Sequence, residues 1–373
     1  MIHLKRILIV NFYEISKLPP VLSLIDVLLR NGYELSVVTF DKDKLMNRYS
    51  DKVNLYILND DMNVPRNFVS RKIQLREVVK KAMENNDILW TTTDRTVREL
   101  GKLVYRYCHV MQLMELIEDI PYFPGQKIIK SHLECYARKA FKVVVPEYNR
   151  AHIQKALWKL DKLPVVLPNK PSNLNQFDAI PSDVEDKINK IMKMNKRLII
   201  YQGVLRKERP LEPFAKAISN MGDGYALLIM GNDSNGEAKV LENKYSCVKS
   251  IGFVTPPYHL KITEKAYIGI LTYVPEYDNK FYQSVLNPVF CAPNKLYEYA
   301  GSGLPMIGND IPGLHYPFDK YHMGVTCNLS DVSDIEKKLN IICKNYDEYK
   351  VGCKTFYDDT NLDDIIVKQI LEE

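Results

Sequence analysis

Short apolar runs rich in β-branched residues alternate with amphipathic helical segments along most of the chain. Arg6 to Val10 is the first such run, and a helix from about Val21 to Arg30 and a second run from Glu34 to Phe40 follow it. A continuous apolar run is typical of a strand that is buried on both faces of a parallel sheet. The β-α-β order therefore predicts a doubly wound α/β fold.

The alternation stops and restarts once, near the middle of the chain. Pro168-Asn169-Lys170-Pro171 closes the first series of strands, and a new strand begins at Arg197. Polar, Pro-containing stretches are typical of linkers, and 373 residues suffice for two domains. We expect an N-terminal domain over residues 1–170, a C-terminal domain over 171–350 and a helical C-terminal segment over 351–373.

Composition and charge argue against several classes of protein. Apolar residues make up 46% of the chain, and 51 basic residues are mixed with 46 acidic ones, so no nucleic-acid footprint is expected. The seven cysteines form no CxxC pair and the seven histidines no HExxH, which leaves a zinc site without support. No apolar run approaches the roughly 20 residues that span a bilayer. We expect a cytoplasmic protein, and a peripheral contact with the inner face of the cell membrane stays open.

Two loops of the first half bear on cofactors. The first strand-to-helix turn, from Asn11 to Pro20, contains no glycine. The G-x-G-x-x-G fingerprint is therefore absent, which argues against an NAD-dependent oxidoreductase. Asp41-Lys42-Asp43 follows the second strand, where two carboxylates could hold a divalent metal, but a solvated surface loop is the commoner meaning of such a pattern.

The segment from Pro293 to Gly313 carries the clearest candidate site. Asn294 suits a helix N-cap, and the Lys295 ammonium at a helix start, where backbone N–H groups are unpaired, favours a phosphate. Glu298, one turn further, could accept hydrogen bonds from sugar hydroxyls. An ordinary capped helix with an early acidic residue is the alternative. A turn at Pro312-Gly313 is expected to follow.

Two further positions lie near predicted strand ends. Gly203 closes the first strand of the second half, and Arg206, Lys207 and Arg209 follow directly, a combination that suits a diphosphate. A solvated basic loop is the alternative there. His109 lies at the end of its segment, where a histidine could orient a reacting group, and a packed core histidine is the alternative.

Four segments, in order along the chain, resemble the donor domain of retaining GT-B glycosyltransferases, specifically the bacterial group 1 (GT4-type) family. They read YQGVLRKERPLEPFAKAI, LLIMGND, VKSIGFV and PNKLYEYAGSGLPMIGNDIPG, and VVLPNKP resembles the end of the family's acceptor domain. The resemblance covers the second half closely and the first half in outline.

The resemblance implies two Rossmann-like domains that face a central cleft, with the C-terminal helix returning to the first domain. It implies transfer of a hexose-type sugar, with retention, from a nucleotide-diphosphate sugar to a glycan or lipid-linked acceptor. Such enzymes build capsules, exopolysaccharides and lipopolysaccharides, usually without a metal, and no other cofactor is expected.

Roles for individual residues also follow from the resemblance. Arg209 and Glu298, with His109 beside the donor sugar, would form the catalytic set. Glu298 would bind the ribose, and the Phe253 backbone would lie beside the base. The donor diphosphate would be bound by Gly203, Arg206, Lys207, Arg209, Asn294, Lys295 and Leu296.

The chain departs from the family pattern at two places. Phe290 stands where the family often has a glutamate, eight residues before Glu298, and residues 14–20 replace a glycine-rich first turn. A nucleotide-sugar epimerase of the same fold and a non-catalytic partner subunit therefore remain as alternatives. The sequence defines neither the donor base and sugar, nor the acceptor and linkage, nor the oligomeric state.

Overall fold

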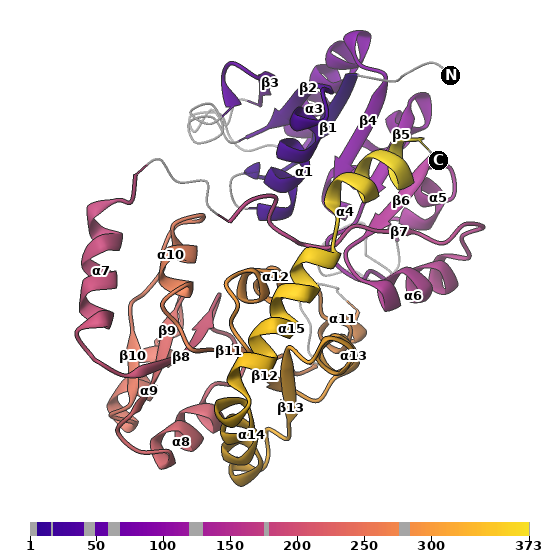
Figure 1. The fold of residues 1–373 in the computed structure, drawn as a ribbon. Helices are drawn as coiled ribbons and strands as arrows, with labels where there is room; N and C mark the ends of the chain where they lie inside the picture. Colours follow the sequence, from indigo (N-terminus) through magenta and orange to yellow (C-terminus); the bar gives the residue numbers. More distant parts are fainter. Residues whose placement is uncertain are drawn as a thin grey trace. The chain divides into compact units, whose positions relative to one another are not determined.

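A computed structural model describes residues 6–15, 18–40, 49–58, 68–118, 130–174, 179–275 and 284–372. They divide into two compact units (Figure 1). One lies within Met1–Ser172, Asp278–Asn287 and Asn361–Glu373, and the other within Asn173–Tyr277 and Pro288–Thr360. Each unit is built on one parallel sheet with helices on both faces, so the predicted doubly wound α/β class is confirmed.

In the described part of the first unit, seven parallel strands are arranged in the order β3-β2-β1-β4-β5-β6-β7. The strands are β1 (Arg6–Val10), β2 (Glu34–Thr39), β3 (Val53–Ile57), β4 (Ile88–Thr92), β5 (Cys108–Gln112), β6 (Lys142–Val145) and β7 (Val165–Val166). The helical segments are α1 (Pro19–Arg30), α3 (Phe68–Ala82), η2 (Met83–Asn85), α4 (Asp94–Leu100), η3 (Gly101–Arg106), α5 (Leu133–Ala137), α6 (Tyr148–Trp158) and the C-terminal η4 (Asp364–Glu372).

Residues of β1 alternate between two apolar layers, as the pleat of a strand requires. Ile7 and Ile9 pack in a cluster with the buried side of α1 and with η4. Leu8 and Val10 belong to a second cluster, with residues of α3 and η3. Burial on both faces explains why the first strand is a continuous apolar run.

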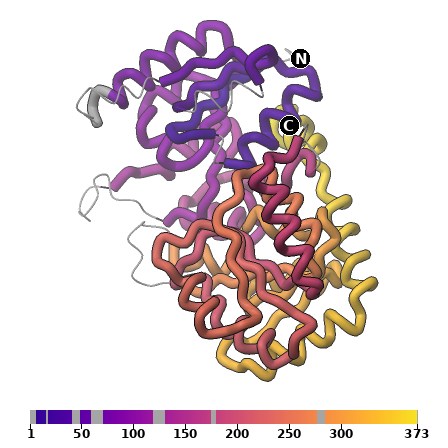
Figure 2. Tube along the Cα trace, turned by 90° about the vertical axis from the view of Figure 1, so that its left-hand side faces the viewer, coloured from indigo at the N-terminus to yellow at the C-terminus, as the bar shows by residue number. Residues whose placement is uncertain are grey.

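The end of the chain returns to the first unit, as expected, and η4 lies beside α1 (Figure 1; Figure 2). Arg30 at the end of α1 forms an ion pair with Asp363. Ile366 and Ile370 are buried in the same apolar cluster as α1. Burial of two isoleucines, at about 1.5–3 kcal/mol each, outweighs the exposed ion pair in holding this segment.

In the described part of the second unit, six parallel strands are arranged in the order β10-β9-β8-β11-β12-β13. The strands are β8 (Arg197–Gln202), β9 (Tyr225–Met230), β10 (Val248–Ser250), β11 (Ile268–Leu271), β12 (Met306–Asn309) and β13 (Gly324–Cys327). The helices are α7 (Ser182–Met192), α8 (Glu212–Asn220), α9 (Glu237–Lys244), α10 (His259–Thr263), α12 (Asn294–Gly301), α13 (Pro312–Tyr321), α14 (Val332–Lys344) and α15 (Tyr346–Asp359). The short helix α11 (Leu286–Val289) begins in residues of the first unit and ends in residues of the second. Residues of α8, α9 and α14 pack on one face of the sheet, and those of α7, α10, α12, α13 and α15 on the other.

The segment after residue 350 differs from the expectation. Residues 351–360 do not turn back to the first unit but continue α15 within the second. Cys353 is fully buried, with its thiol 3.1 Å from the Leu304 carbonyl oxygen, and the ring of Phe356 stacks on Tyr297 at 4.7 Å. These contacts keep α15 on the second sheet as far as Asp359, so only the residues from 361 onward join the first unit.

Pro312 and Gly313 begin a helix where the sequence analysis expected a turn. Pro312 occupies the first position of α13, where its missing N–H leaves no intrahelical bond unmade. A β-carbon on Gly313 would lie 2.6 Å from the Cys291 backbone nitrogen, so close packing explains the glycine. Among the residues that the structure describes, no helix is both long and apolar enough to cross a membrane.

Candidate functional site

Most of the candidate site residues lie in the second unit, where the order of strands reverses between β8 and β11. In open parallel sheets, ligands bind at the carboxyl ends of the strands at this point. Gly203 follows β8 directly, and Tyr273 comes two residues after the end of β11. The Asn309 amide, at the end of β12, hydrogen-bonds to both the N–H and the carbonyl of Tyr273 at 2.9 and 2.8 Å and holds this loop in place.

Lys295 is a buried cation at this edge of the sheet. It is the second residue of α12, its side chain is 6% exposed, and its Nζ atom lies 4.0 Å from the centre of the Tyr201 ring. Among the described residues, Nζ has no hydrogen-bond partner. Burial, and then the charge of Arg209, hold the pKa of Lys295 well below its usual value. An ammonium buried in this way lacks the partner that normally compensates burial.

Arg209 is the second cation of the site. Its guanidinium lies 5.6 Å from the centre of the Tyr273 ring and donates a 3.4 Å hydrogen bond to the Val204 carbonyl, but its buried Nε has no partner in the described part of the chain. A β-carbon built on Gly203 would lie 3.5 Å from Lys295 Nζ and 3.9 Å from Arg209 Nη1. The two positive groups therefore converge on the backbone at Gly203, whose φ is +129°.

The start of α12 differs in detail from the sequence expectation. The helix begins at Asn294, and Pro293 occupies the N-cap position without a side-chain cap, so Asn294 is not the capping residue. The Leu296 N–H already donates to the Pro293 carbonyl at 3.1 Å. The amides of Asn294 and Lys295 are the N–H groups that a helix start leaves without an intrahelical partner, and they favour an anion.

Glu298 lies one turn further along α12 and is buried. Its carboxylate accepts a hydrogen bond from the Gln202 amide and lies 3.3 Å from His259 Nε2. The Thr263 hydroxyl donates a 2.7 Å hydrogen bond to the side-chain Oε1 of Gln202, so the orientation of that side-chain amide is fixed. His259 Nδ1 is buried and has no partner among the residues described.

Sequence reasoning missed both neighbours of Glu298. Gln202 is the last residue of β8, and a polar side chain at that strand end is a signal that could have been used. His259 opens the short helix α10, 39 residues before Glu298 along the chain, in no recognisable motif. Its proximity to Glu298 follows from tertiary packing alone.

Tyr299 fixes the position of α12 on the sheet. Its buried hydroxyl accepts a hydrogen bond from the Gln202 N–H at 3.1 Å and donates to the Ile200 carbonyl at 3.3 Å. A β-carbon on Gly269 would lie 2.3 Å from the Tyr299 ring, so only glycine leaves room for the ring on β11. These contacts place Lys295 and Glu298 on the same edge of the sheet.

The side chains of three candidate residues are exposed. Arg206 and Lys207 are exposed, and Arg206 lies 3.5 Å from the carboxylate of Glu208. Phe253 follows β10, its side chain is 59% exposed, and its carbonyl accepts a 3.1 Å hydrogen bond from Lys187. The Arg209 N–H donates a 2.8 Å hydrogen bond to the Arg206 carbonyl, so this turn joins the two residues through the backbone.

His109 is not at a strand end that faces a ligand. It is the second residue of β5, pairs in register with Leu89, and is 2% exposed. Its Nε2 atom lies 2.8 Å from the Thr91 hydroxyl, and burial lowers the pKa of His109 to about 3. The alternative of a packed, hydrogen-bonded core histidine describes this geometry.

The sequence suggested one candidate metal-binding loop, at residues 41–43. Asp41, Lys42 and Asp43 lie outside the described residues. Within the part of the chain that the structure describes, no three His, Cys, Asp or Glu side chains come together as metal ligands.

The fold is shared with several proteins of known structure. No family model matches the chain, and no curated protein is similar to it in sequence. Sucrose-phosphate synthase from Thermosynechococcus elongatus is 14% identical, with a TM-score of 0.66 over 95% of this chain and 93% of that one. HepE from Anabaena, in complex with UDP and glucose, is 15% identical, with a TM-score of 0.65 over 99% and 98%.

A third structure has a different described activity. A protein from Listeria monocytogenes described as UDP-N-acetylglucosamine 2-epimerase is 12% identical, with a TM-score of 0.59 over 94% of this chain and 90% of that one. In all three comparisons the superposed residues make up nearly the whole of both chains. Together with the two sheets, these comparisons show that the chain has the GT-B fold.

Proposed function

We propose that the protein is a retaining glycosyltransferase that uses a nucleotide-diphosphate sugar as its donor. It moves a hexose-type sugar to a glycan or lipid-linked acceptor, in the cytoplasmic synthesis of a bacterial surface polysaccharide. The observation that carries the proposal is the pair of converging cations, buried Lys295 and half-buried Arg209, at the carboxyl edge of the second sheet. Two convergent, incompletely bonded cations are the complement of a diphosphate.

The cation pair would stabilise the leaving group. When the bond between sugar and diphosphate breaks, negative charge grows on the departing phosphate oxygens. Preorganised cations and helix N–H groups stabilise that charge most strongly where water is excluded, as it is around Lys295. Gly203, without a side chain, leaves the space beside Lys295 Nζ and Arg209 Nη1 open for the diphosphate.

Other residues would position the nucleoside. Glu298 has carboxylate oxygens to accept hydrogen bonds from ribose hydroxyls, and Gln202 and His259 hold it in one orientation. Phe253, Arg206 and Lys207 are exposed at or after strand ends of the same unit, where they would contact the base and the outer diphosphate oxygens. We assign no catalytic role to His109, because its ring is buried against Thr91.

The structural comparisons support the same class of donor. HepE shares the fold and was solved with UDP and glucose, and sucrose-phosphate synthase shares it as well. In this proposal Arg209 and Lys295 supply the positive charge, so no metal is required. Turnover is then expected to persist in the presence of EDTA.

A donor panel tests the proposal. Uridine and guanosine diphosphate sugars are screened by thermal shift, because a ligand that binds the folded state stabilises it. We expect one donor to raise the melting temperature and to release its nucleoside diphosphate when a suitable acceptor is added. Arg209→Ala and Glu298→Ala should abolish the shift, whereas Lys344→Ala, an exposed change on α14, should leave it intact. If no donor binds, or if the two variants behave like the wild type, the proposal fails.

A nucleotide-sugar epimerase is the second candidate. The Listeria monocytogenes protein, which is described as an epimerase, has the same fold. His259 beside Glu298 also supplies a second titratable group at the site. Conversion of the donor to its epimer without any acceptor, followed by NMR spectroscopy, would favour the epimerase.

A further inference from the structure

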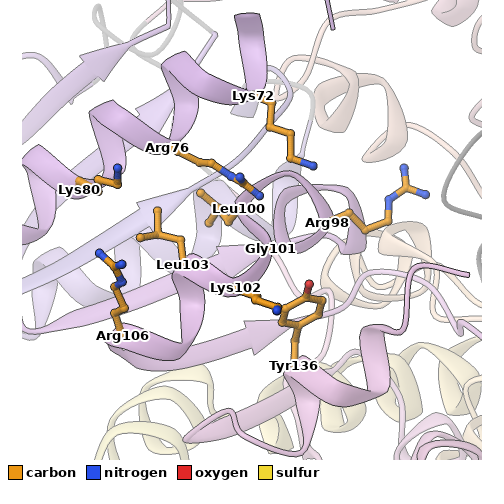
Figure 3. A pocket seen from close by; sticks show the side chains of 10 residues that line it. All are labelled: Lys72, Arg76, Lys80, Arg98, Leu100, Gly101, Lys102, Leu103, Arg106 and Tyr136. Atoms are coloured by element: carbon orange, nitrogen blue, oxygen red, sulfur yellow. The ribbon is translucent and has the colours of Figure 1, made fainter. Parts of the chain in front are cut away.

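A second concentration of positive charge lies in the first unit, in a pocket of about 440 Å³ between α3 and the segment formed by α4 and η3 (Figure 3). Six of its lining residues are cations, and none is a carboxylate. In Figure 3, Lys72, Arg76 and Lys80 extend from α3, and the other cations extend from the opposite wall. The six cations are Lys72, Arg76, Lys80, Arg98, Lys102 and Arg106.

The spacing of these cations concentrates like charge. Lys72, Arg76 and Lys80 follow one another at intervals of four on α3, so they share one side of the helix. Arg98, Lys102 and Arg106 repeat the same interval on the facing segment. Like charges four residues apart destabilise a helix by about 0.2–0.5 kcal/mol per pair. Folding alone therefore does not favour this arrangement.

Arg76 occupies the centre of the pocket and is held there. Its Nε donates a 2.9 Å hydrogen bond to the Glu99 carbonyl. A β-carbon on Gly101 would lie 2.6 Å from Arg76 Nη2, and Gly101 has a φ of +57°. The glycine thus leaves space for the guanidinium over the backbone, with Leu100 and Leu103 as apolar neighbours in the lining.

Acidic residues near the pocket interact with cations of its lining. Glu77 forms an exposed ion pair with Lys80 at 2.8 Å. Asp94 and Glu99 of α4 interact electrostatically with Arg98. These carboxylates lie outside the lining, so an anion inside the pocket would meet only cationic, apolar and tyrosine side chains.

We propose that this pocket binds a compact polyanion that carries two or more phosphate groups. Opposed rows of cations around a concave space suit several phosphates close together, and the planar guanidinium of Arg76 suits two oxygens of one phosphate. The pocket shares no residue with the candidate donor site, because all of its residues belong to the first unit. It does not depend on the proposed glycosyltransferase activity.

Binding of inorganic tripolyphosphate to the full chain tests the proposal. The titration is made by calorimetry in a Lys295→Met background, so that the donor site does not contribute. Arg76→Gln should weaken binding at least about tenfold, since a hydrogen bond to a charged group is lost. Lys102→Gln combined with Arg106→Gln, two exposed positions, gives a second variant that should also weaken binding. Binding should weaken with added salt.

Controls separate this site from general charge and from the donor site. Lys155→Gln combined with Lys162→Gln removes two charges from the same unit outside the pocket and should leave the affinity unchanged. Thermal melts of the free Lys102→Gln, Arg106→Gln double variant should show a melting temperature equal to or above that of the parent, because like-charge repulsion is relieved. Arg76→Gln also loses the hydrogen bond to the Glu99 carbonyl, so its melt checks only that the variant is folded. Affinity that is the same in the pocket variants and the parent would overturn the proposal.

Vesicles provide the last arm of the test. They contain phosphatidylcholine with one-fifth phosphatidylglycerol. Vesicle binding that depends on Arg76, without measurable tripolyphosphate binding, would overturn the proposal in favour of a membrane-facing surface. Because every titration uses the Lys295→Met background, failure here leaves the donor-site hypothesis untouched.

Discussion

His109 in the first unit and Lys295 in the second are both titratable side chains that folding removes from water. His109 is 2% exposed and Lys295 6% exposed. The difference lies in their partners. His109 Nε2 meets the Thr91 hydroxyl at 2.8 Å, whereas Lys295 Nζ has no hydrogen-bond partner among the described residues. Burial with a partner marks a structural group, and burial without one marks a place where a ligand completes the bonding.

Their positions on the sheets sharpen the contrast. His109 is second in β5, near the amino end of a strand. Lys295 lies with Gly203 beside the reversal point between β8 and β11, at carboxyl ends. Ligands of doubly wound sheets bind at carboxyl ends, so topology and hydrogen bonding select the same residue.

The largest effect is expected for Lys295→Met. Donor binding and turnover should fall at least about 100-fold, because a preorganised positive group at the diphosphate is lost. The free protein should become more stable by about 1–3 kcal/mol, since an apolar side chain replaces an unpaired buried ammonium. Calorimetric titration with the donor and chemical denaturation measure the two effects.

The stability gain should depend on pH. In the free protein the pKa of Lys295 is lowered by burial and by Arg209, whereas in the unfolded chain it lies near 10.4. The unfolded state therefore binds more protons between these two values, and wild-type stability rises with pH through that interval. The advantage of the variant should shrink accordingly and vanish above about pH 10.4. Lys344→Met on α14 is the control. If Lys295→Met is less stable than the wild type at pH 7, the buried Lys295 side chain does not destabilise the free protein.

The stability of the protein at acidic pH tests the structural role of His109. The pKa of His109 is about 3 in the folded state and about 6.5 in the unfolded chain. Because the unfolded chain binds the proton more readily, the free energy of unfolding is unaffected by His109 above pH 6.5 and decreases as the pH falls toward 3. At pH 5 the loss is about 2 kcal/mol, on 1.36 kcal/mol per pKa unit. His109→Gln should reduce this loss, as measured by urea unfolding at pH 7 and pH 5.

The matched control for this experiment is His152→Gln, an exposed histidine on α6 in the same unit. It should leave the pH dependence unchanged. The His109→Gln protein should keep its turnover at pH 7. If it instead loses turnover while its stability at pH 7 is unchanged, His109 contacts the substrate and the structural reading is wrong.

Lys295 and Arg209 converge on the backbone at Gly203. A substitution at Gly203 should have a smaller effect on donor binding than Lys295→Met. Gly203→Ala should cost about 1–2 kcal/mol, because a side chain is strained at positive φ. Its methyl group would lie 3.5 Å from Lys295 Nζ, so the affinity for the donor should fall by about tenfold as well. Gly224→Ala, where a β-carbon meets nothing within 4 Å, is the control. Equal affinities of the two variants would remove Gly203 from the site.

The sequence predicted the sheet scaffold because its signals are local. Residues 7–10 and 198–201 are continuous apolar runs, and the structure buries both faces of each strand there. The start of α12 was also visible from its residues, although the N-cap position was wrong by one residue. Pro312 was misread, because proline both ends chain segments and opens helices, and the choice depends on packing that the local sequence does not show.

The surroundings of the candidate site could be predicted only in part. The sequence predicted Lys295 from its place at a helix start, and Gly203 and Arg209 from their places after a strand end. Their role in binding a diphosphate stays a prediction. The aromatic ring of Tyr201 under Lys295 and the imidazole of His259 beside Glu298 were missed. Both contacts join elements far apart in the chain, and no residue spacing encodes them.

The smallest effect is expected at Asn294, and it tests whether this side chain caps the helix. α12 begins at Asn294, and Pro293 occupies its N-cap position without a side-chain cap hydrogen bond. Asp331, by contrast, is the N-cap of α14 and accepts hydrogen bonds from the amides of Ser333 and Asp334. Asp331→Ala should therefore cost about 1 kcal/mol in urea unfolding, whereas Asn294→Ala should change stability by less than about 0.5 kcal/mol. If Asn294→Ala costs as much stability as Asp331→Ala, the Asn294 side chain caps α12. Some of the N–H groups at the helix start beside Lys295 would then already be hydrogen-bonded and would not be available to a diphosphate.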